Sequence, residues 1–201
     1  MPFPWVFKPN RLGSSVGVAI FRDAESLIRQ AGDLIASWPE SSRGDDLLVE
    51  EAVTGRELTC GVIETGDRAF PLPPIEIRPH GHEFFDYHAK YTRGASEEIC
   101  PAPLSPAETE AVERIASEVH TLFDCAPLSR TDLFLTQEGT IEVLEVNTLP
   151  GLTETSLIPL SASKAGIPLA TLFEDILEHA LRRAEAQGWY ARAGNRASGG
   201  L

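Results

Sequence analysis

The chain has 201 residues, is 42% hydrophobic and carries a formal net charge of −13. This length allows one domain or two small ones with a buried core. The acidic balance argues against a general nucleic-acid or membrane-surface binder, because phosphate-rich surfaces attract basic patches. No apolar run approaches the roughly 20 residues that cross a bilayer, so a membrane-spanning segment is not expected.

Cysteine usage and the first residues predict a cytoplasmic location. The three cysteines are an odd number without metal-ligand spacing, which suits a reducing compartment and predicts packing roles. The first ten residues lack the charged start and apolar stretch of a signal peptide.

The first elements predicted are two strands, Phe3–Lys8 and Val16–Phe21, joined by the loop KPNRLGSSVGV. The loop lacks the GK[ST] ending of a P-loop. Its backbone N–H groups could still fold over phosphates, with Lys8 adding a positive charge. A flexible turn without ligand is the other interpretation, and the pattern leaves both open.

The next elements are a helix, three strands and a long connection. Apolar residues recur at helical spacing from Leu27 to Trp38, after a possible N-cap at Asp23. Strands are predicted at Leu47–Val53, Glu57–Glu64 and Ala69–Ile77. The connection Arg78–Pro103 follows, and its length is typical of a functional or disordered segment.

The second half of the chain predicts two more core-facing helices around a hairpin. Ser105-Pro106-Ala107-Glu108 forms a capping box before an apolar stripe from Val112 to Phe123. A third stripe runs from Leu169 to Leu181. Strands and helices mix without regular βαβ alternation, which favours an α+β fold. A loose tail covers Gly194–Leu201.

The segment SRTDLFLTQEGTIEVLEVNTLPG predicts an antiparallel hairpin, with strands Thr131–Thr136 and Thr140–Val146. Folding about its turn places Asp132 nearly opposite Glu145, with Asn147 on the same face as Glu145. Arg130 is expected on the opposite face unless the strand end twists. The flanking residues are apolar, so these oxygens are expected against a core. They suit Mg²⁺ or Mn²⁺; solvated carboxylates beside a turn asparagine are an equal alternative.

The loop and the hairpin, together with LLVEEAVTGRELTCGV, DYHAKYTRGA and EVNTLPGLTETSLIP, resemble the ATP-grasp ligases. Within them the chain is similar to the D-alanine–D-alanine ligase family, from about Phe3 to Arg183. The resemblance implies an incomplete ATP-grasp fold and ATP-dependent joining of two D-alanines, through an acyl phosphate, for peptidoglycan synthesis. It implies ATP and two Mg²⁺ or Mn²⁺ ions as cofactors, and D-alanine as substrate.

The resemblance also implies roles for individual residues. Lys8 matches a lysine on the nucleotide phosphates, and Glu57 matches a ribose-binding glutamate. The adenine-binding strand segment corresponds to Glu50, Glu51 and Val53.

Further matched positions concern catalysis. Ser14 resembles a loop serine that orients substrate, and Arg130 resembles an arginine that stabilises the developing charge. Lys90 and Tyr91 match the mobile loop that closes over the site. The metal ligands correspond to Asp132, Glu145 and Asn147. The positions around the second D-alanine correspond to Gly151, Ser156 and Leu157.

The resemblance covers the C-terminal two thirds of the family pattern. It predicts half of a central subdomain in residues 1–53, a catalytic domain in residues 54–185 and a tail in residues 186–201. A fragment, half of a split enzyme and a short paralogue are all compatible with this. The incomplete sheet predicts a homo-oligomer or a missing N-terminal domain as partner. A non-catalytic nucleotide-binding or interaction module, and a ligase for another amino or hydroxy acid, are the alternative functions.

Overall fold

The computed structural model describes residues 1–13, 15–42, 44, 46–66, 68–79 and 96–186. The chain forms two compact units. The first comprises Met1–Gly55 and Ile77–Glu98, and the second comprises Arg56–Glu76 and Ile99–Leu201. Among the described residues, no helix combines the length and apolar character needed to span a membrane.

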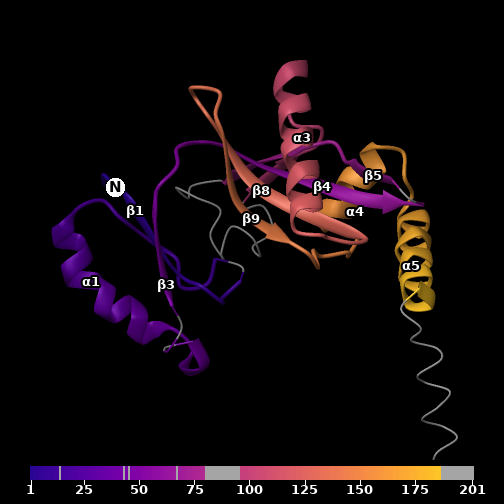
Figure 1. Ribbon diagram of the computed structural model, residues 1–201. Helices are drawn as coiled ribbons and strands as arrows, with labels where there is room; N and C mark the ends of the chain where they lie inside the picture. Colours follow the sequence, from indigo (N-terminus) through magenta and orange to yellow (C-terminus); the bar gives the residue numbers. More distant parts are fainter. Residues whose placement is uncertain (14, 43, 45, 67, 80–95, 187–201) are drawn as a thin grey trace, which may run out of the picture. The chain divides into compact units, whose positions relative to one another are not determined.

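A three-stranded antiparallel sheet of order β2-β1-β3 forms the frame of the first unit (Figure 1). Its strands are β1 (Trp5–Pro9), β2 (Ala19–Phe21) and β3 (Leu47–Glu51). The helix α1 (Ala24–Ser37) follows β2, and a short 3₁₀ turn spans Glu40–Ser42. Phe7 and Phe21 meet edge to face with ring centroids 4.9 Å apart.

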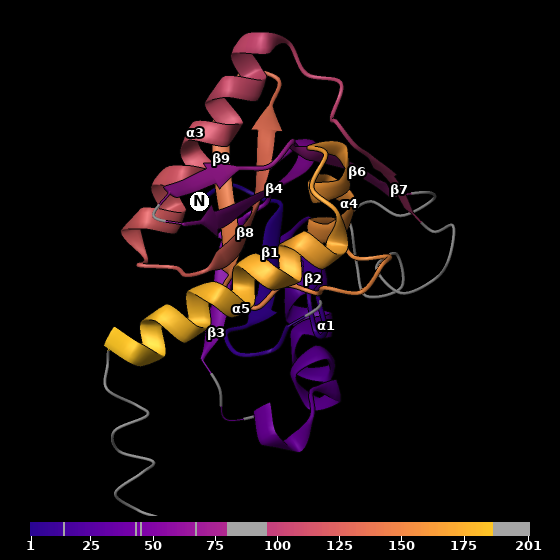
Figure 2. The same ribbon diagram turned by 90° about the vertical axis from the view of Figure 1, so that its right-hand side faces the viewer.

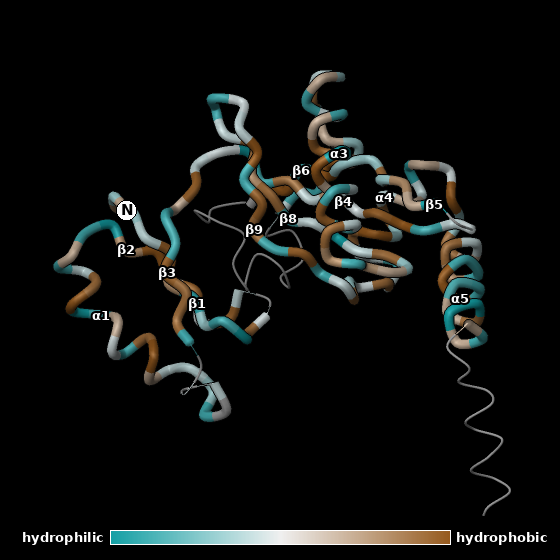
Figure 3. The backbone as a smooth tube through the Cα atoms, viewed as in Figure 1, coloured by the Kyte–Doolittle hydropathy of each residue, from teal (hydrophilic) through white to brown (hydrophobic). Residues whose placement is uncertain are grey.

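The predicted helix in this unit exists, but it is less buried than a core-facing helix should be. Asp23 caps α1 by accepting the Ser26 N–H at 2.7 Å, as the sequence predicts. Apolar and polar residues alternate along α1 in Figure 3, yet none of its residues is fully buried and Ile28 is 84% exposed. A small sheet offers too little surface to cover a whole helix face.

The larger sheet has six strands in the order β7-β6-β4-β8-β9, with β5 paired to β4. The strands β4, β5, β8 and β9 frame the second unit, whereas most of β6 and β7 is counted with the first. The strands are β4 (Gly55–Thr65), β5 (Arg68–Pro71), β6 (Ile75–Pro79), β7 (Ser96–Ile99), β8 (Leu128–Thr136) and β9 (Ile141–Asn147). The helices are α3 (Pro106–Leu122), α4 (Leu157–Lys164) and α5 (Leu169–Ala186). Figure 2 shows α3 and α4 on different sides of the β4–β8–β9 part of this sheet.

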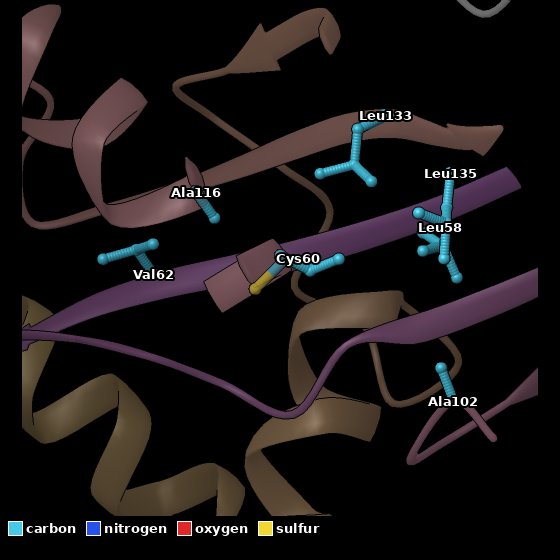
Figure 4. Close-up of a cluster of buried hydrophobic side chains, with 8 residues drawn as sticks. Leu58, Cys60, Val62, Ala102, Ala116, Leu133 and Leu135 are labelled. Atoms are coloured by element: carbon cyan, nitrogen blue, oxygen red, sulfur yellow. The ribbon is translucent and has the colours of Figure 1, made fainter. Parts of the chain in front are cut away.

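Strand alternation gives this sheet two buried faces. On one face, α3 packs against a cluster drawn in Figure 4, which comprises Leu58, Cys60, Val62, Ala102, Val112, Ala116, Leu133 and Leu135. On the other face, α4 and α5 pack against a cluster that comprises Ile63, Leu72, Leu128, Ile158, Ala162 and Leu172. In β4, Leu58, Cys60 and Val62 belong to the first cluster and Ile63 belongs to the second, so β4 contributes to both cores.

The α+β fold class is confirmed, with several local corrections. The predicted strand Ala69–Ile77 is two strands, because Pro73 and Pro74 have no N–H to donate to a ladder. The short helix α4 and the strand β7 were not predicted. The capping box of α3 is present, but Leu122 and Phe123 at its end are 79% and 62% exposed rather than buried. His120 takes their place on the core side of the helix.

Candidate functional site

The hairpin of β8 and β9 collects four polar side chains on one face of the sheet. Its register pairs Asp132 with Glu145 and Arg130 with Asn147. Directly opposed residues share a face, so these four side chains form one patch, called here the acidic hairpin face. The predicted pairing of Asp132 with Glu145 is confirmed. A register irregularity follows at Asp132/Leu133 and ends the regular pairing there.

The predicted orientation of Arg130 is wrong. Residues at positions i and i+2 of a strand point to the same face, and Asp132 is two positions after Arg130. The guanidinium forms a bidentate pair with the carboxylate, with Nε to Oδ1 at 2.8 Å and Nη2 to Oδ2 at 2.7 Å. The side chains are only 18% and 13% exposed. Arg130 therefore supplies the positive charge that a buried carboxylate needs.

Asp132 has a second partner that the sequence did not indicate. Thr59 in β4 donates its hydroxyl hydrogen to Asp132 Oδ1 at 2.6 Å. The same hydroxyl lies 3.3 Å from the carbonyl oxygen of Thr131. Thr59 is 1% exposed, so its side chain is held in the core. In the sequence, Thr59 is recognisable only as a hydroxyl residue between the apolar residues of a buried strand. Its partner could not be identified there, because Asp132 lies 73 positions away in the chain.

Glu145 and Asn147 complete the acidic hairpin face in a different environment. The amide Nδ2 of Asn147 donates to Glu145 Oε1 at 3.1 Å. Asp132 is 9% exposed, which confirms the expected burial, whereas Glu145 is exposed and the expectation is wrong there. The strand β9 lies at the end of the sheet order, so its side chains receive less cover. Two carboxylates and one amide oxygen nonetheless form an oxygen-only donor set, which fits a hard divalent cation.

The turn after the hairpin brings the three predicted substrate residues together. A Cβ at Gly151 would lie 2.8 Å from Ser156 Oγ, so a larger residue there would displace the Ser156 side chain. Ser156 Oγ accepts the Thr153 N–H at 3.1 Å and lies 2.8 Å from Thr153 Oγ1. Ser156 is the N-cap residue of α4, and Leu157 begins that helix. Gly151, Ser156 and Leu157 therefore share one compact turn.

The predicted nucleotide residues of the first unit lie on its small sheet. Lys8 Nζ forms an ion pair with Glu50 Oε2 at 2.6 Å, with side chains 23% and 42% exposed. Glu51 ends β3 opposite Trp5, and Val53 follows the strand. The structure thus brings Lys8 and Glu50 into contact on neighbouring strands.

The loop between β1 and β2 has a defined shape at its described residues. Ser15 has a φ of 57° and Gly17 a φ of 75°, both in the left-handed region. The buried Trp38 donates its Nε1–H to the Gly17 carbonyl at 3.2 Å. A Cβ at Gly17 would lie 2.6 Å from that nitrogen, so glycine is needed there. This anchoring does not support the flexible-turn interpretation at Gly17, while a phosphate role stays a prediction.

The remaining predicted residues are Glu57, Ser14, Lys90 and Tyr91. Glu57 lies in β4 of the second unit, two positions before Thr59. Ser14, Lys90 and Tyr91 lie outside the described residues. The described candidates therefore divide between the two units: Lys8, Glu50, Glu51 and Val53 lie in the first unit and the others in the second.

Comparison with known proteins gives the family. The model of the family "D-ala D-ala ligase C-terminus" matches residues 1–178. A D-alanine–D-alanine ligase of Methylacidiphilum infernorum is 40% identical over 191 residues, which is 94% of this chain and 59% of that protein. The crystal structure of a D-alanine–D-alanine ligase of Bacillus anthracis complexed with ATP has a TM-score of 0.71 at 34% identity. It is covered over 56% of its length, and this chain over 93%.

A further solved neighbour is a ligase named for a different second substrate, D-serine. The VanG D-Ala:D-Ser ligase of Enterococcus faecalis has a TM-score of 0.73 at 28% identity, over 89% of this chain and 50% of that one. The chain thus spans 50% to 59% of the length of these relatives. Because the family model covers nearly the whole described chain, the protein belongs to the D-alanine–D-alanine ligase family, in the region of its C-terminal model.

Proposed function

We propose that this chain carries out, or forms the catalytic part of, the ATP-dependent joining of two D-alanines with release of ADP and phosphate. The observation that carries the proposal is the acidic hairpin face, where Asp132, Glu145 and Asn147 lie beside Arg130 in a member of this ligase family. We also propose residues 1–53 as part of the central ATP-grasp subdomain, 54–185 as the catalytic domain and 186–201 as a tail.

In this proposal the two groups of residues have separate tasks. Asp132, Glu145 and Asn147 would hold Mg²⁺ or Mn²⁺, which would neutralise phosphate charge. Arg130, fixed beside them, stabilises the negative charge that develops during phosphoryl and acyl transfer. On the first unit, Lys8 contacts the phosphates. Backbone groups from Glu50 to Val53 contact adenine.

The chemistry needs two bond exchanges. A carboxylate oxygen of the first D-alanine attacks the γ-phosphorus of ATP, the bond to ADP breaks, and an acyl phosphate forms. The amine of the second D-alanine attacks the acyl carbon and loses a proton, and the carbon–oxygen bond to phosphate then breaks. Because no covalent bond to the protein is required, positioning and charge neutralisation carry the catalysis. The turn of Gly151, Ser156 and Leu157 is proposed to bind the second D-alanine.

The nature of the second substrate is a separate question. The D-Ala:D-Ser ligase among the structural neighbours makes D-serine a specific alternative at the second position. A D-hydroxy acid such as D-lactate is the other candidate. These alternatives change the acceptor and leave the first bond exchange unchanged.

The test is release of ADP by the purified 201-residue chain with ATP and Mg²⁺, with D-alanine alone or with D-alanine plus D-serine or D-lactate. D-Alanine-dependent ADP release that Glu145→Gln removes would support the proposal, and product mass would identify the acceptor. ATP binding without any D-alanine-dependent ADP release would favour the non-catalytic nucleotide-binding module.

A further inference from the structure

We propose that Thr59 is a positioning residue of the divalent-cation site: its hydroxyl holds Asp132 so that one carboxylate oxygen stays available to the cation. The inference rests on the proposed function, which assigns Asp132 as a metal ligand. Thr59 is neither acidic nor near Asp132 in the chain, and its role follows only from the contact between β4 and β8.

The hydrogen bonds of Asp132 divide unequally between its two oxygens. Oδ1 accepts from Thr59 Oγ1 at 2.6 Å and from Arg130 Nε at 2.8 Å. Oδ2 accepts from Arg130 Nη2 at 2.7 Å. A carboxylate oxygen has about two lone-pair sites. The contacts to Thr59 and Arg130 fill those of Oδ1 and leave capacity on Oδ2, which we assign as the oxygen for the cation.

The single hydroxyl proton of Thr59 goes to Asp132 rather than to the Thr131 carbonyl. The distance to Asp132 Oδ1 is 2.6 Å and the distance to Thr131 O is 3.3 Å. Hydrogen bonds from a hydroxyl to an ionised carboxylate are short and roughly twice as strong as neutral ones. Thr59 therefore acts on the carboxylate.

Thr59 matters because the other restraint on Asp132 has a second proposed task. Arg130 is proposed to stabilise the negative charge that develops during the reaction. Its ion pair with Asp132 is therefore expected to weaken when substrate is present. Thr59 is 1% exposed in the middle of β4, and the packing on either side of that strand keeps its side chain in place. Hydrogen bonds that orient a metal ligand typically change metal affinity by about 10- to 100-fold when removed.

The chain offers a matched pair of threonines for the test. Thr59→Val removes the hydroxyl at nearly constant volume, while Thr59→Ser keeps it. Thr131→Val makes the same isosteric change at a residue that is 0% exposed and adjacent to Asp132. Within the described part of the chain, the Thr131 hydroxyl has no hydrogen-bond partner, so its removal takes nothing from the carboxylate.

The experiment titrates Mn²⁺ alone into the full chain and measures free Mn²⁺ by electron paramagnetic resonance. Glu145→Gln, which should abolish the binding, identifies the site. We expect Thr59→Val to weaken Mn²⁺ binding by about tenfold or more, and Thr59→Ser and Thr131→Val to stay within about threefold of wild type. Circular dichroism checks each fold. If Thr59→Val does not fold, Thr59→Cys replaces it, because a thiol is a weaker donor and should give an intermediate affinity.

Each contrary outcome has a distinct meaning. Mn²⁺ binding by the wild type that Thr59→Val leaves unchanged overturns the positioning role and leaves the proposed function intact. Equal weakening by Thr59→Val and Thr131→Val overturns it too, because the effect would be general loosening of the strands. Absence of any Mn²⁺ binding by the wild type overturns the metal site of the proposed function, and the inference with it.

Discussion

At the level of single residues, the two carboxylates of the acidic hairpin face differ in their surroundings. Asp132 is 9% exposed and is held by Arg130 and Thr59, whereas Glu145 is exposed and contacts the Asn147 amide. Removing a charge from a buried pair leaves its partner uncompensated, while an exposed group can turn to water. One carboxylate is therefore part of the fold, and the other is available mainly for ligands.

This difference predicts unequal effects of two isosteric substitutions. Asp132→Asn is expected to lower the free energy of unfolding by about 2–4 kcal/mol, because a neutral amide no longer balances the positive charge of Arg130 at this half-buried pair. Glu145→Gln is expected to change it by less than about 0.5 kcal/mol. Urea unfolding without metal measures both. Equal losses of stability would contradict the assigned environments.

The ion pair between Lys8 and Glu50 predicts competition with a nucleotide. Glu50 Oε2 lies 2.6 Å from Lys8 Nζ and so neutralises the ammonium group that is proposed to contact the phosphates. Because exposed pairs contribute at most about 1 kcal/mol, Glu50→Gln is expected to tighten ADP binding by up to about fivefold.

Isothermal titration calorimetry at low salt measures this change. Lys8→Met serves as the control and should weaken ADP binding. Weaker ADP binding by Glu50→Gln would show that the carboxylate itself helps to hold the nucleotide.

At the level of elements, β4 and α4 approach each other closely beside the turn that contains Gly151, Ser156 and Leu157. A Cβ at Gly61 would lie 2.5 Å from Ile158 Cδ1 and 3.1 Å from Leu72 Cδ1. Ile158 is 1% exposed and lies one residue after Leu157. The absence of a side chain at Gly61 therefore lets the first turn of α4 pack against the sheet.

Gly61→Ala is expected to destabilise the chain by about 1–3 kcal/mol through overpacking. Ile158→Val removes the Cδ1 atom that clashes, at a cost of about 0.5–1.5 kcal/mol alone. The double variant should be more stable than the sum of the two single effects predicts. If the effects of Gly61→Ala and Ile158→Val on urea unfolding were additive, the new Cβ would be accommodated by movement of atoms other than Ile158 Cδ1.

The capping carboxylates predict the response to acid. The Ser105 hydroxyl and then its backbone N–H lower the pKa of Glu108, and the Ser26 N–H lowers that of Asp23. A carboxyl with a lower pKa in the folded state binds its proton less readily there than in the unfolded chain. Its stabilisation is present above the ordinary pKa and is lost as the pH falls through the folded value.

Glu108→Gln removes one of these titrations while keeping a capping side chain. The melting temperature of the variant, measured from pH 7 down to pH 3, is expected to fall less steeply below about pH 4.5 than that of the wild type. Parallel curves for the two proteins would exclude Glu108 as a contributor to acid sensitivity.

At the level of the whole molecule, the small sheet of the first unit predicts self-association. Its order leaves β2 and β3 as edge strands among the described residues, and Leu48 on β3 is 38% exposed. Unpaired edge strands bind other strands unless charges or cover prevent it. We expect the mass from light scattering to rise with protein concentration.

A charged residue on this edge should oppose such pairing. Leu48→Lys is expected to shift the mass toward the monomer. Ile28→Lys, a change at an even more exposed apolar residue on α1, is expected to have little effect because it lies off the edge. A wild type that stays monomeric at all concentrations would contradict the prediction.

Much of the secondary structure could be predicted because its signals are local. The capping residues Asp23 and Ser105 lie within a few positions of the N–H groups they accept. The pairing of Asp132 with Glu145 follows from a short turn and strand alternation. The orientation of Arg130 could have been predicted from the same alternation. The helix α4 was missed because Pro159 and a length of eight residues hide a helical pattern.

The sequence by itself determined the α+β class, the main elements, the family resemblance and the hairpin register. Each of these depends on residues close in the chain or on a contiguous sequence motif. Only the tertiary structure decided which carboxylate is buried, that Thr59 holds Asp132, that Glu50 pairs with Lys8, and that Gly61 makes room for Ile158. These features depend on which strands and helices become neighbours. Packing between distant segments sets that arrangement, and no local pattern records it.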